Sequence, residues 1–112
     1  MPLTESRAQQ TIFFSADPAV VADACKNALD ELGRVDVVSR ETGVISGRMK
    51  VSWGTNWVFM TVTVARKDAG TQLDIQAQRK EGLITGGGAQ QALALFAGNL
   101  GARLKGQSTA GW

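Results

Sequence analysis

Apolar and polar side chains alternate most regularly between residues 57 and 78. Valine or methionine occupies every second position of the first half, and leucine, isoleucine and alanine alternate with glutamine and aspartate in the second half. A period of two is typical of strands that bury one face. The four residues 67–70 then close an antiparallel hairpin, in which Val62 lies opposite Ile75 and all the apolar side chains face the core.

A strand and a helix are predicted before this hairpin. The β-branched and aromatic run 11–15 indicates a strand. Asp17 and Pro18 then supply a helix cap and a first helical residue, and apolar residues recur with a helical period as far as Leu32. Gly33 follows, where a left-handed cap is expected to end the helix. The apolar stripe of this helix consists of Val20, Val21, Ala24, Cys25, Ala28, Leu29 and Leu32.

Residues 34–39 and 44–53 predict two further strands. The dipeptide 54–55, Gly-Thr, suits a two-residue type II′ turn and joins the second of these strands to the hairpin. This turn sets Gly47 opposite Val62 on the inner face of the sheet. Because glycine has no side chain, we expect a helix backbone to approach the sheet closely at that point.

A second helix is predicted at 89–105, after three consecutive glycines. Its apolar stripe faces the sheet, and a second stripe of small residues lies beside it. Gly98 and Gly101 belong to that second stripe, and each costs about 1 kcal/mol of helix stability against alanine. We therefore expect a partner that packs closely against them.

The order of these elements defines the fold class. A strand, a helix, four strands in a meander and a helix predict an α+β two-layer sandwich, β-α-β-β-β-β-α, with an antiparallel sheet and two helices on one face. Across residues 11–105 this order resembles the helix-grip or TATA-binding-protein-like arrangement, in which a curved sheet wraps a long C-terminal helix. Such folds host several functions, and the resemblance assigns no site residues. We expect one domain at 11–105, an N-terminal segment at 1–10 and a flexible tail at 106–112.

Composition argues against most catalytic chemistry. The 112 residues include no histidine and no tyrosine, and the carboxylates show no paired or metal-binding spacing. Cys25 falls within the apolar stripe of the first helix, where an inert core thiol is expected rather than a nucleophile. We therefore predict a protein that is not an enzyme and that needs neither a cofactor nor a metal.

Charge and hydropathy bear on partners and location. Twelve basic and ten acidic residues give a net charge of +2, which is too small to indicate nucleic acid. The polar segment 1–10 resembles no signal peptide, and no stretch reaches the roughly 20 apolar residues of a membrane span. The single cysteine needs no oxidising compartment, so a cytoplasmic location without membrane contact is predicted.

Aromatic residues on the polar face of the sheet are the first candidate site. Trp57 and Phe59 alternate with the buried residues of their strand and therefore project away from the core. An aromatic pair beside cationic and amide side chains is typical of interaction surfaces. The candidate interface consists of Trp57, Phe59, Arg48, Lys50, Gln76 and Gln78.

A pocket between the sheet and the second helix is the other candidate site. Leu83 and Ile84 could form its lip, although the same lining residues also suit an ordinary packed core. The candidate pocket consists of Met49, Met60, Val62, Ile75, Leu83, Ile84, Leu93 and Phe96.

Three functions follow from these two sites. The leading hypothesis is a non-catalytic domain that associates with itself or docks a protein partner through the open sheet face or edge. The alternative is a helix-grip pocket that binds a small apolar ligand. The third is single-stranded nucleic-acid binding, with bases stacked on the sheet face.

Overall fold

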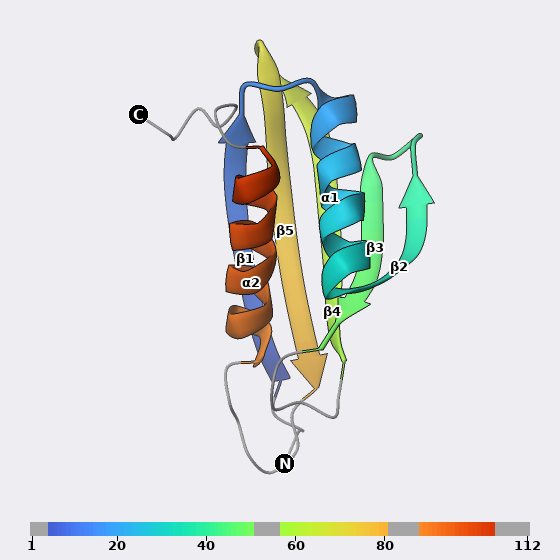
Figure 1. The fold of residues 1–112 in the computed structure, drawn as a ribbon, viewed down its shortest axis with the longest axis vertical. Coiled ribbons are helices and arrows are strands. Elements are labelled where there is room, and N and C mark those ends of the chain that lie inside the picture. The colour runs from blue at the N-terminus through green and yellow to red at the C-terminus, as the bar shows by residue number, and fades with distance from the viewer. Residues whose placement is uncertain (1–4, 51–56, 81–87, 105–112) are drawn as a thin grey trace.

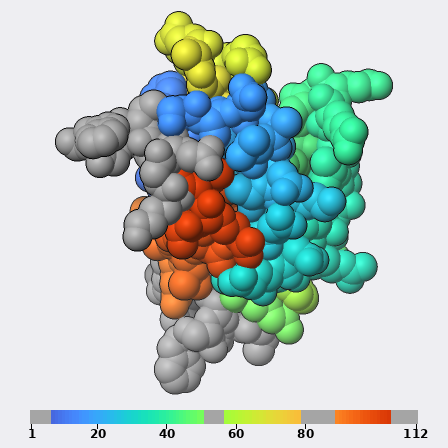
Figure 2. All heavy atoms as spheres, turned by 45° about the horizontal axis from the view of Figure 1, so that its top comes forward, coloured from blue at the N-terminus to red at the C-terminus, as the bar shows by residue number. Residues whose placement is uncertain are grey.

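The computed structural model describes residues 5–50, 57–80 and 88–104, and it confirms the predicted fold class. Five antiparallel strands form one sheet in the order β1-β5-β4-β3-β2, and both helices pack on the same face (Figure 1). The helices lie side by side over the sheet in Figure 2. The elements are β1 (Glu5–Phe14), α1 (Pro18–Leu32), β2 (Gly33–Ser39), β3 (Val44–Met49), β4 (Val58–Lys67), β5 (Gly70–Lys80) and α2 (Gly88–Arg103). Within the described residues, neither helix is long and apolar enough to cross a membrane.

The β4–β5 hairpin has the predicted register. Met60 lies opposite Ala77, Val62 opposite Ile75 and Val64 opposite Leu73. Ladder pairing continues as far as the turn, where Lys67 lies opposite Gly70, and Asp68 in this turn has a positive φ of 52°. The period of two was sufficient to predict this register, because both strands bury one face and the length of the turn fixes how they pair.

Strand β1 is longer than the predicted run 11–15. It begins at Glu5 and pairs with β5 along its whole length, from Glu5 opposite Lys80 to Phe14 opposite Thr71. Its first half is polar, and ladder pairing through the backbone needs no apolar side chains. For this reason hydropathy missed the first half of the strand.

Helix α1 begins and ends where predicted, but the conformations at its two caps differ from those expected. Its N-cap Asp17 forms no side-chain cap hydrogen bond, and its carboxylate instead lies 3.5 Å from the guanidinium of Arg66. Gly33 was expected to adopt a left-handed conformation, but its φ of −174° is extended backbone. A Cβ atom there would lie 1.9 Å from the carbonyl oxygen of Arg48. Glycine therefore serves the close approach of β2 to β3, not the cap.

The predicted register between β3 and β4 was wrong by two residues. Gly47 lies opposite Met60, where Val62 was expected, and Met49 lies opposite Val58. Strand β3 ends at Met49, short of the predicted end at residue 53, and the predicted turn at 54–55 lies outside the described residues. Since an even shift leaves every side chain on its face, the alternation pattern could not distinguish the two registers.

Gly47 is a point of close approach, although not to a helix backbone. A Cβ atom at Gly47 would lie 2.3 Å from the carbonyl oxygen of Arg34 in β2 and 3.3 Å from the side chain of Leu29 in α1. The pairing of β2 with β3 shifts just beyond this point, at a bulge between Val35 and Val37. The crowding at Gly47 therefore comes mainly from the neighbouring strand.

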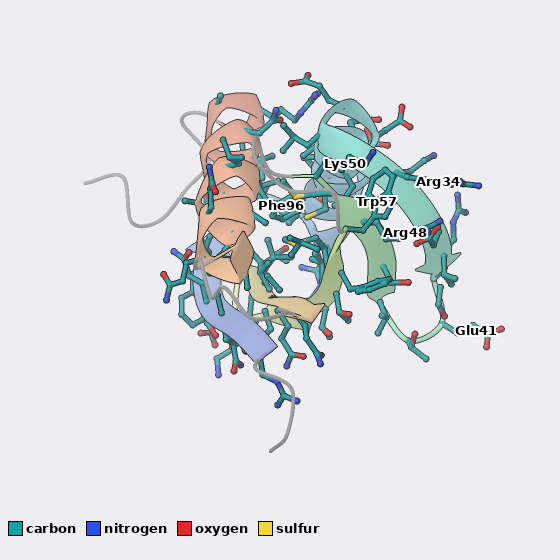
Figure 3. The ribbon with its side chains drawn as sticks, turned by 90° about the horizontal axis from the view of Figure 1, so that it is seen from below. Arg34, Glu41, Arg48, Lys50, Trp57 and Phe96 are labelled. Carbon is teal, nitrogen blue, oxygen red and sulfur yellow. The ribbon has the colours of Figure 1, made fainter. Side chains whose placement is uncertain are left out.

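Helix α2 packs one stripe of large apolar residues against the sheet. Phe96 and Leu100 are fully buried, and Figure 3 shows Phe96 pointing from α2 toward the strands. Gly98 and Gly101 are exposed, and apart from the adjoining backbone of α2 itself, no heavy atom of the described residues comes within 4 Å of a Cβ placed at either position. The closely packed partner expected for these glycines is therefore absent from the described part of the chain.

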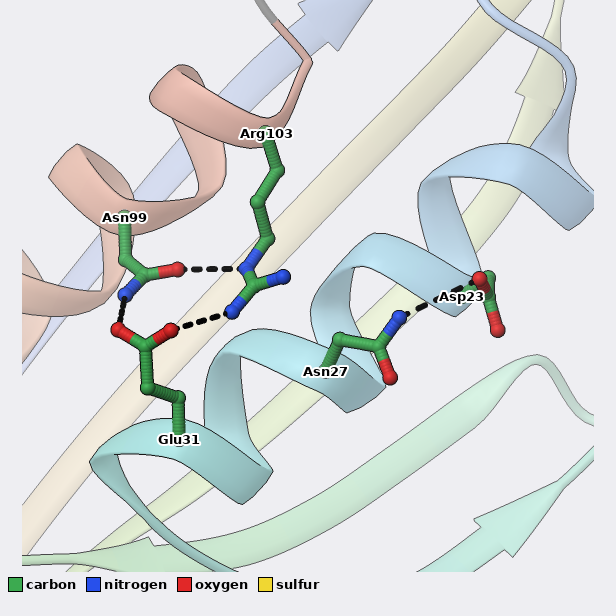
Figure 4. A network of polar contacts seen from close by, with 5 residues as sticks. All are labelled: Asp23, Asn27, Glu31, Asn99 and Arg103. Carbon is green, nitrogen blue, oxygen red and sulfur yellow. Dashed lines mark hydrogen bonds and ion pairs between the residues drawn. The ribbon is translucent and has the colours of Figure 1, made fainter.

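A polar network joins the two helices at their C-terminal ends (Figure 4). Arg103 on α2 donates through Nη2 to Oε1 of Glu31 on α1 at 2.7 Å. Asn99 donates to the other carboxylate oxygen at 2.7 Å and accepts a hydrogen bond from Arg103 Nε. Both oxygens of Glu31 are thus paired with α2, which fixes how the helices sit beside each other.

Candidate interaction surface

Two cations and an aromatic ring meet where β3 ends and β4 begins. Lys50 directly follows β3 and Trp57 directly precedes β4. The ammonium of Lys50 lies 4.8 Å from the Trp57 ring centroid, and the guanidinium carbon of Arg48 lies 5.5 Å from it. Figure 3 shows Trp57 between these two side chains. Both distances are within the range of cation–π attraction, worth about 0.5–1 kcal/mol each at exposed sites.

An acidic residue on β2 orients Arg48. Asp36 accepts two hydrogen bonds from that guanidinium, at 3.0 Å from Nε and 3.1 Å from Nη2. Arg34 approaches the same carboxylate at 3.9 Å. The bulge in β2 leaves Asp36 without a partner in the ladder, which lets its side chain reach Arg48. We call Arg34, Asp36, Arg48, Lys50, Trp57 and Phe59 the aromatic–cation cluster.

Phe59 extends this cluster over the outer face of the sheet, the face away from the helices. Its side chain is 54% exposed, and it lies directly between Arg48 on β3 and Gln78 on β5. Gln76 lies further along β5, opposite Thr61. Four of the predicted interface residues therefore belong to this cluster, and a fifth, Gln78, lies beside it. The sixth, Gln76, lies two residues further along β5 on the same face.

Sequence reasoning missed the part of this surface that lies on β1 and β2. Arg7 lies opposite Gln78 and Gln9 lies opposite Gln76, so the outer face continues onto β1. A shallow hollow of about 270 Å³ lies at this junction. Residues 7–11 are mostly polar and show no period of two, so the sequence did not indicate this strand. The role of Asp36 depends on a bulge that the sequence did not reveal.

The predicted pocket residues are part of the core. Met49, Met60, Val62, Ile75, Leu93 and Phe96 are each at most 8% exposed and belong to one hydrophobic cluster. Leu83 and Ile84, the predicted lip, lie outside the described residues. The described lining thus has the burial expected of a packed core.

Groups with catalytic potential are scarce in the described part of the chain. Cys25 is fully buried, and this burial raises the pKa of its thiol to about 12, so the reactive thiolate is disfavoured at neutral pH. Among the described residues, no three histidine, cysteine, aspartate or glutamate side chains are grouped to hold a metal ion.

Solved structures share this architecture. The crystal structure of Ara h 8.0201 superposes with a TM-score of 0.62 at 11% identity, covering 90% of this chain and 99% of that one. Mll3558 from Rhizobium loti gives 0.51 at 15% identity, covering 93% and 100%, and a putative uncharacterized protein from Rhizobium leguminosarum gives 0.50 at 13% identity, covering 94% and 99%. No protein-family model matches the sequence, and no curated protein sequence matches it either. The chain therefore has an α+β fold of the helix-grip type, and at these identities the likeness extends to the fold alone.

Proposed function

We propose that this protein is a non-catalytic interaction domain that associates with a second copy of itself through the outer face of its sheet. The observation that carries the proposal is the aromatic–cation cluster, in which Phe59 is half exposed beside a tryptophan contacted by two cations. Aromatic and arginine side chains are enriched in the energetic centres of protein interfaces.

The geometry of the cluster favours association. Asp36 holds Arg48 through two hydrogen bonds, so less side-chain entropy is lost when a partner covers the cluster. Complete burial of an exposed aromatic side chain contributes about 1.5–3 kcal/mol, and roughly half of the Phe59 surface remains to be covered. In a two-fold dimer, the cations of one copy can stack on the Phe59 ring of the other.

Solution mass tests this proposal. Sedimentation equilibrium over a concentration series should show the parent rising from the 11.9 kDa of one chain toward twice that mass. The double variant Trp57→Ala, Phe59→Ala should stay monomeric with an unchanged circular dichroism spectrum. Leu95→Ala is a matched control, because Leu95 is 44% exposed but lies on α2, away from the outer face. A monomeric parent at all concentrations, or a double variant that still dimerises, would refute the proposal.

The same samples test the third function. Two rings flanked by cations could also stack single-stranded bases. Anisotropy of a labelled oligonucleotide would then show salt-sensitive binding that the double variant loses. Such binding by a monomeric parent would make nucleic acid the partner in place of a second copy.

The fold itself favours one other candidate function. Helix-grip folds accommodate apolar ligands, and the pocket predicted beneath α2 would be such a site. The burial of its described lining weighs against this reading, since those six residues already belong to the core cluster. A panel of apolar dyes that raises the melting temperature at saturation would favour it, by mass action.

The proposed function includes a cytoplasmic location and a single domain. The single thiol of Cys25 is buried and needs no oxidising compartment, which is compatible with the cytoplasm. We propose one domain for this function, which consists of the predicted residues 11–105 together with the earlier residues of β1, because β1 pairs with β5 from Glu5 onward.

A further inference from the structure

A second hollow lies on the helix side of the sheet, between α1 and the β2–β3 hairpin. Its volume is about 500 Å³, within the range of roughly 300–1,000 Å³ typical of small-molecule sites. In Figure 2 its walls belong to the blue residues of α1 and the green residues of the hairpin. It is lined by Pro18, Ala19, Ala22, Asp23, Lys26, Val38, Ser39, Arg40, Gly43, Ile45 and Val64. We call it the α1–β2 groove.

The bulge in β2 and the small residues of α1 account for this groove. Val38 pairs with Ile45 on the inner face of the sheet, yet Val38 is 46% exposed while Ile45 is 2% exposed. Helix α1 therefore covers β3 but not the end of β2. Where it faces the hairpin, α1 presents Ala19 and Ala22, which are too short to fill the space. The result is an apolar floor that remains open to solvent.

Cations predominate among the charged residues of the groove. Lys26 on α1 and Arg40, which directly follows β2, both line it, and neither has an ion-pair partner among the described residues. Asp23 is the acidic member of the lining, and its carboxylate accepts a hydrogen bond from Asn27 at 3.3 Å. An apolar floor beneath unpaired cations matches a ligand with a hydrocarbon chain and an anionic head.

We propose that the α1–β2 groove binds an amphipathic carboxylate with an alkyl chain of medium length. The chain lies along Ala22 and Val38, and the carboxylate pairs with Lys26 or Arg40. This site is separate from the aromatic–cation cluster, since the two lie on opposite faces of the sheet, and it does not depend on self-association.

Decanoate is the probe for this site, with decanol and decyltrimethylammonium as matched ligands of the same chain length. Titration of ¹⁵N-labelled protein below the micellar concentration should show saturable shifts at the amides of Ala22, Lys26, Val38 and Arg40. Decanoate should bind more tightly than decanol and much more tightly than the cation, and the preference should weaken as salt is added. Shifts centred on Phe96 beneath α2, or on Trp57 at the outer face, would overturn the assignment. Equal affinity for decanoate and decanol would overturn the role of the cations.

Two variants test the groove directly. Lys26→Glu with Arg40→Glu should weaken decanoate binding about tenfold while leaving decanol unchanged. Ala22→Trp should fill the groove and abolish the binding of both decanoate and decanol. The control Lys67→Glu reverses an exposed charge outside the lining and should bind as the parent does. If Ala22→Trp fails to fold, the double charge variant still tests the groove, because its two substitutions are on the surface. If the charge variant binds decanoate as tightly as the parent does, the proposal is refuted. The solution mass of each variant is measured separately, so a failure of self-association can be distinguished from a failure of decanoate binding.

Discussion

Two glycine-to-alanine substitutions should have opposite effects on stability. At Gly47, the added Cβ would lie 2.3 Å from the carbonyl oxygen of Arg34, whereas real Cβ atoms essentially never lie closer than 3.0 Å. The obstructing atom is backbone in a paired strand, so β2 and β3 must move apart. At Gly98, no described atom outside the adjoining backbone of α2 lies within 4 Å of the added Cβ.

The magnitudes follow from these surroundings. Overpacking at Gly47 should reduce the free energy of unfolding by about 1–3 kcal/mol. Gly98→Ala should increase it by about 1 kcal/mol, because alanine is the better residue inside an exposed helix. Both substitutions restrict the unfolded chain to a similar extent, so the difference between them, about 2–4 kcal/mol, reports on the folded state.

Thermal unfolding followed by circular dichroism measures both variants. For a domain of this size, 1 kcal/mol corresponds to about 4 °C, so Gly47→Ala should lower the melting temperature by about 4–12 °C and Gly98→Ala should raise it by about 4 °C. An unchanged melting temperature for Gly47→Ala would mean that Arg34 does not lie against residue 47, and the pairing of β2 with β3 would then be wrong.

Two further predictions concern buried groups. Thr71 is 1% exposed, and its hydroxyl donates a hydrogen bond to the carbonyl oxygen of Ala16 at 2.7 Å. Thr71→Val leaves that carbonyl without its donor, so urea unfolding should show a free energy of unfolding lower by about 1–3 kcal/mol. Thr71→Ser keeps the hydroxyl and should retain most of the stability. Burial raises the pKa of the Cys25 thiol from 9.0 to about 12. As the pH rises, this thiol therefore loses its proton at a lower pH in the unfolded chain than in the folded protein, so the free energy of unfolding should fall between pH 9 and pH 12. Cys25→Ala should flatten that decline, and a thiol reagent that labels the native parent rapidly at neutral pH would contradict the buried thiol.

Local patterns were enough to predict the architecture but not every register. The hairpin of β4 and β5 followed from alternation and a short turn, and α1 followed from its apolar stripe. The pairing of Gly47 depends on how β3 is connected to β4, which alternation does not encode. The start of β1 was hidden because its pairing with β5 depends on backbone groups that are the same in every residue.

The candidate interface was predictable in part for similar reasons. The facing of Phe59 followed from strand parity, and the structure places it beside Arg48 and Gln78. The contribution of Asp36 was not predictable, because a bulge changes which side chains meet across a pair of strands. The α1–β2 groove was also hidden, since it exists where α1 fails to cover Val38, and such an absence of packing leaves no pattern in hydropathy.

The pairing of β1 with β5 affects how this chain can fold during synthesis. Glu5 pairs with Lys80, so β1 leaves the ribosome well before its partner strand β5 has been made. Helix α2, which packs on both of these strands, comes later still. Contacts between such distant parts of a sequence slow folding and leave strand edges exposed meanwhile. The polar first half of β1, which concealed the strand from hydropathy, therefore also makes the waiting segment less prone to aggregate.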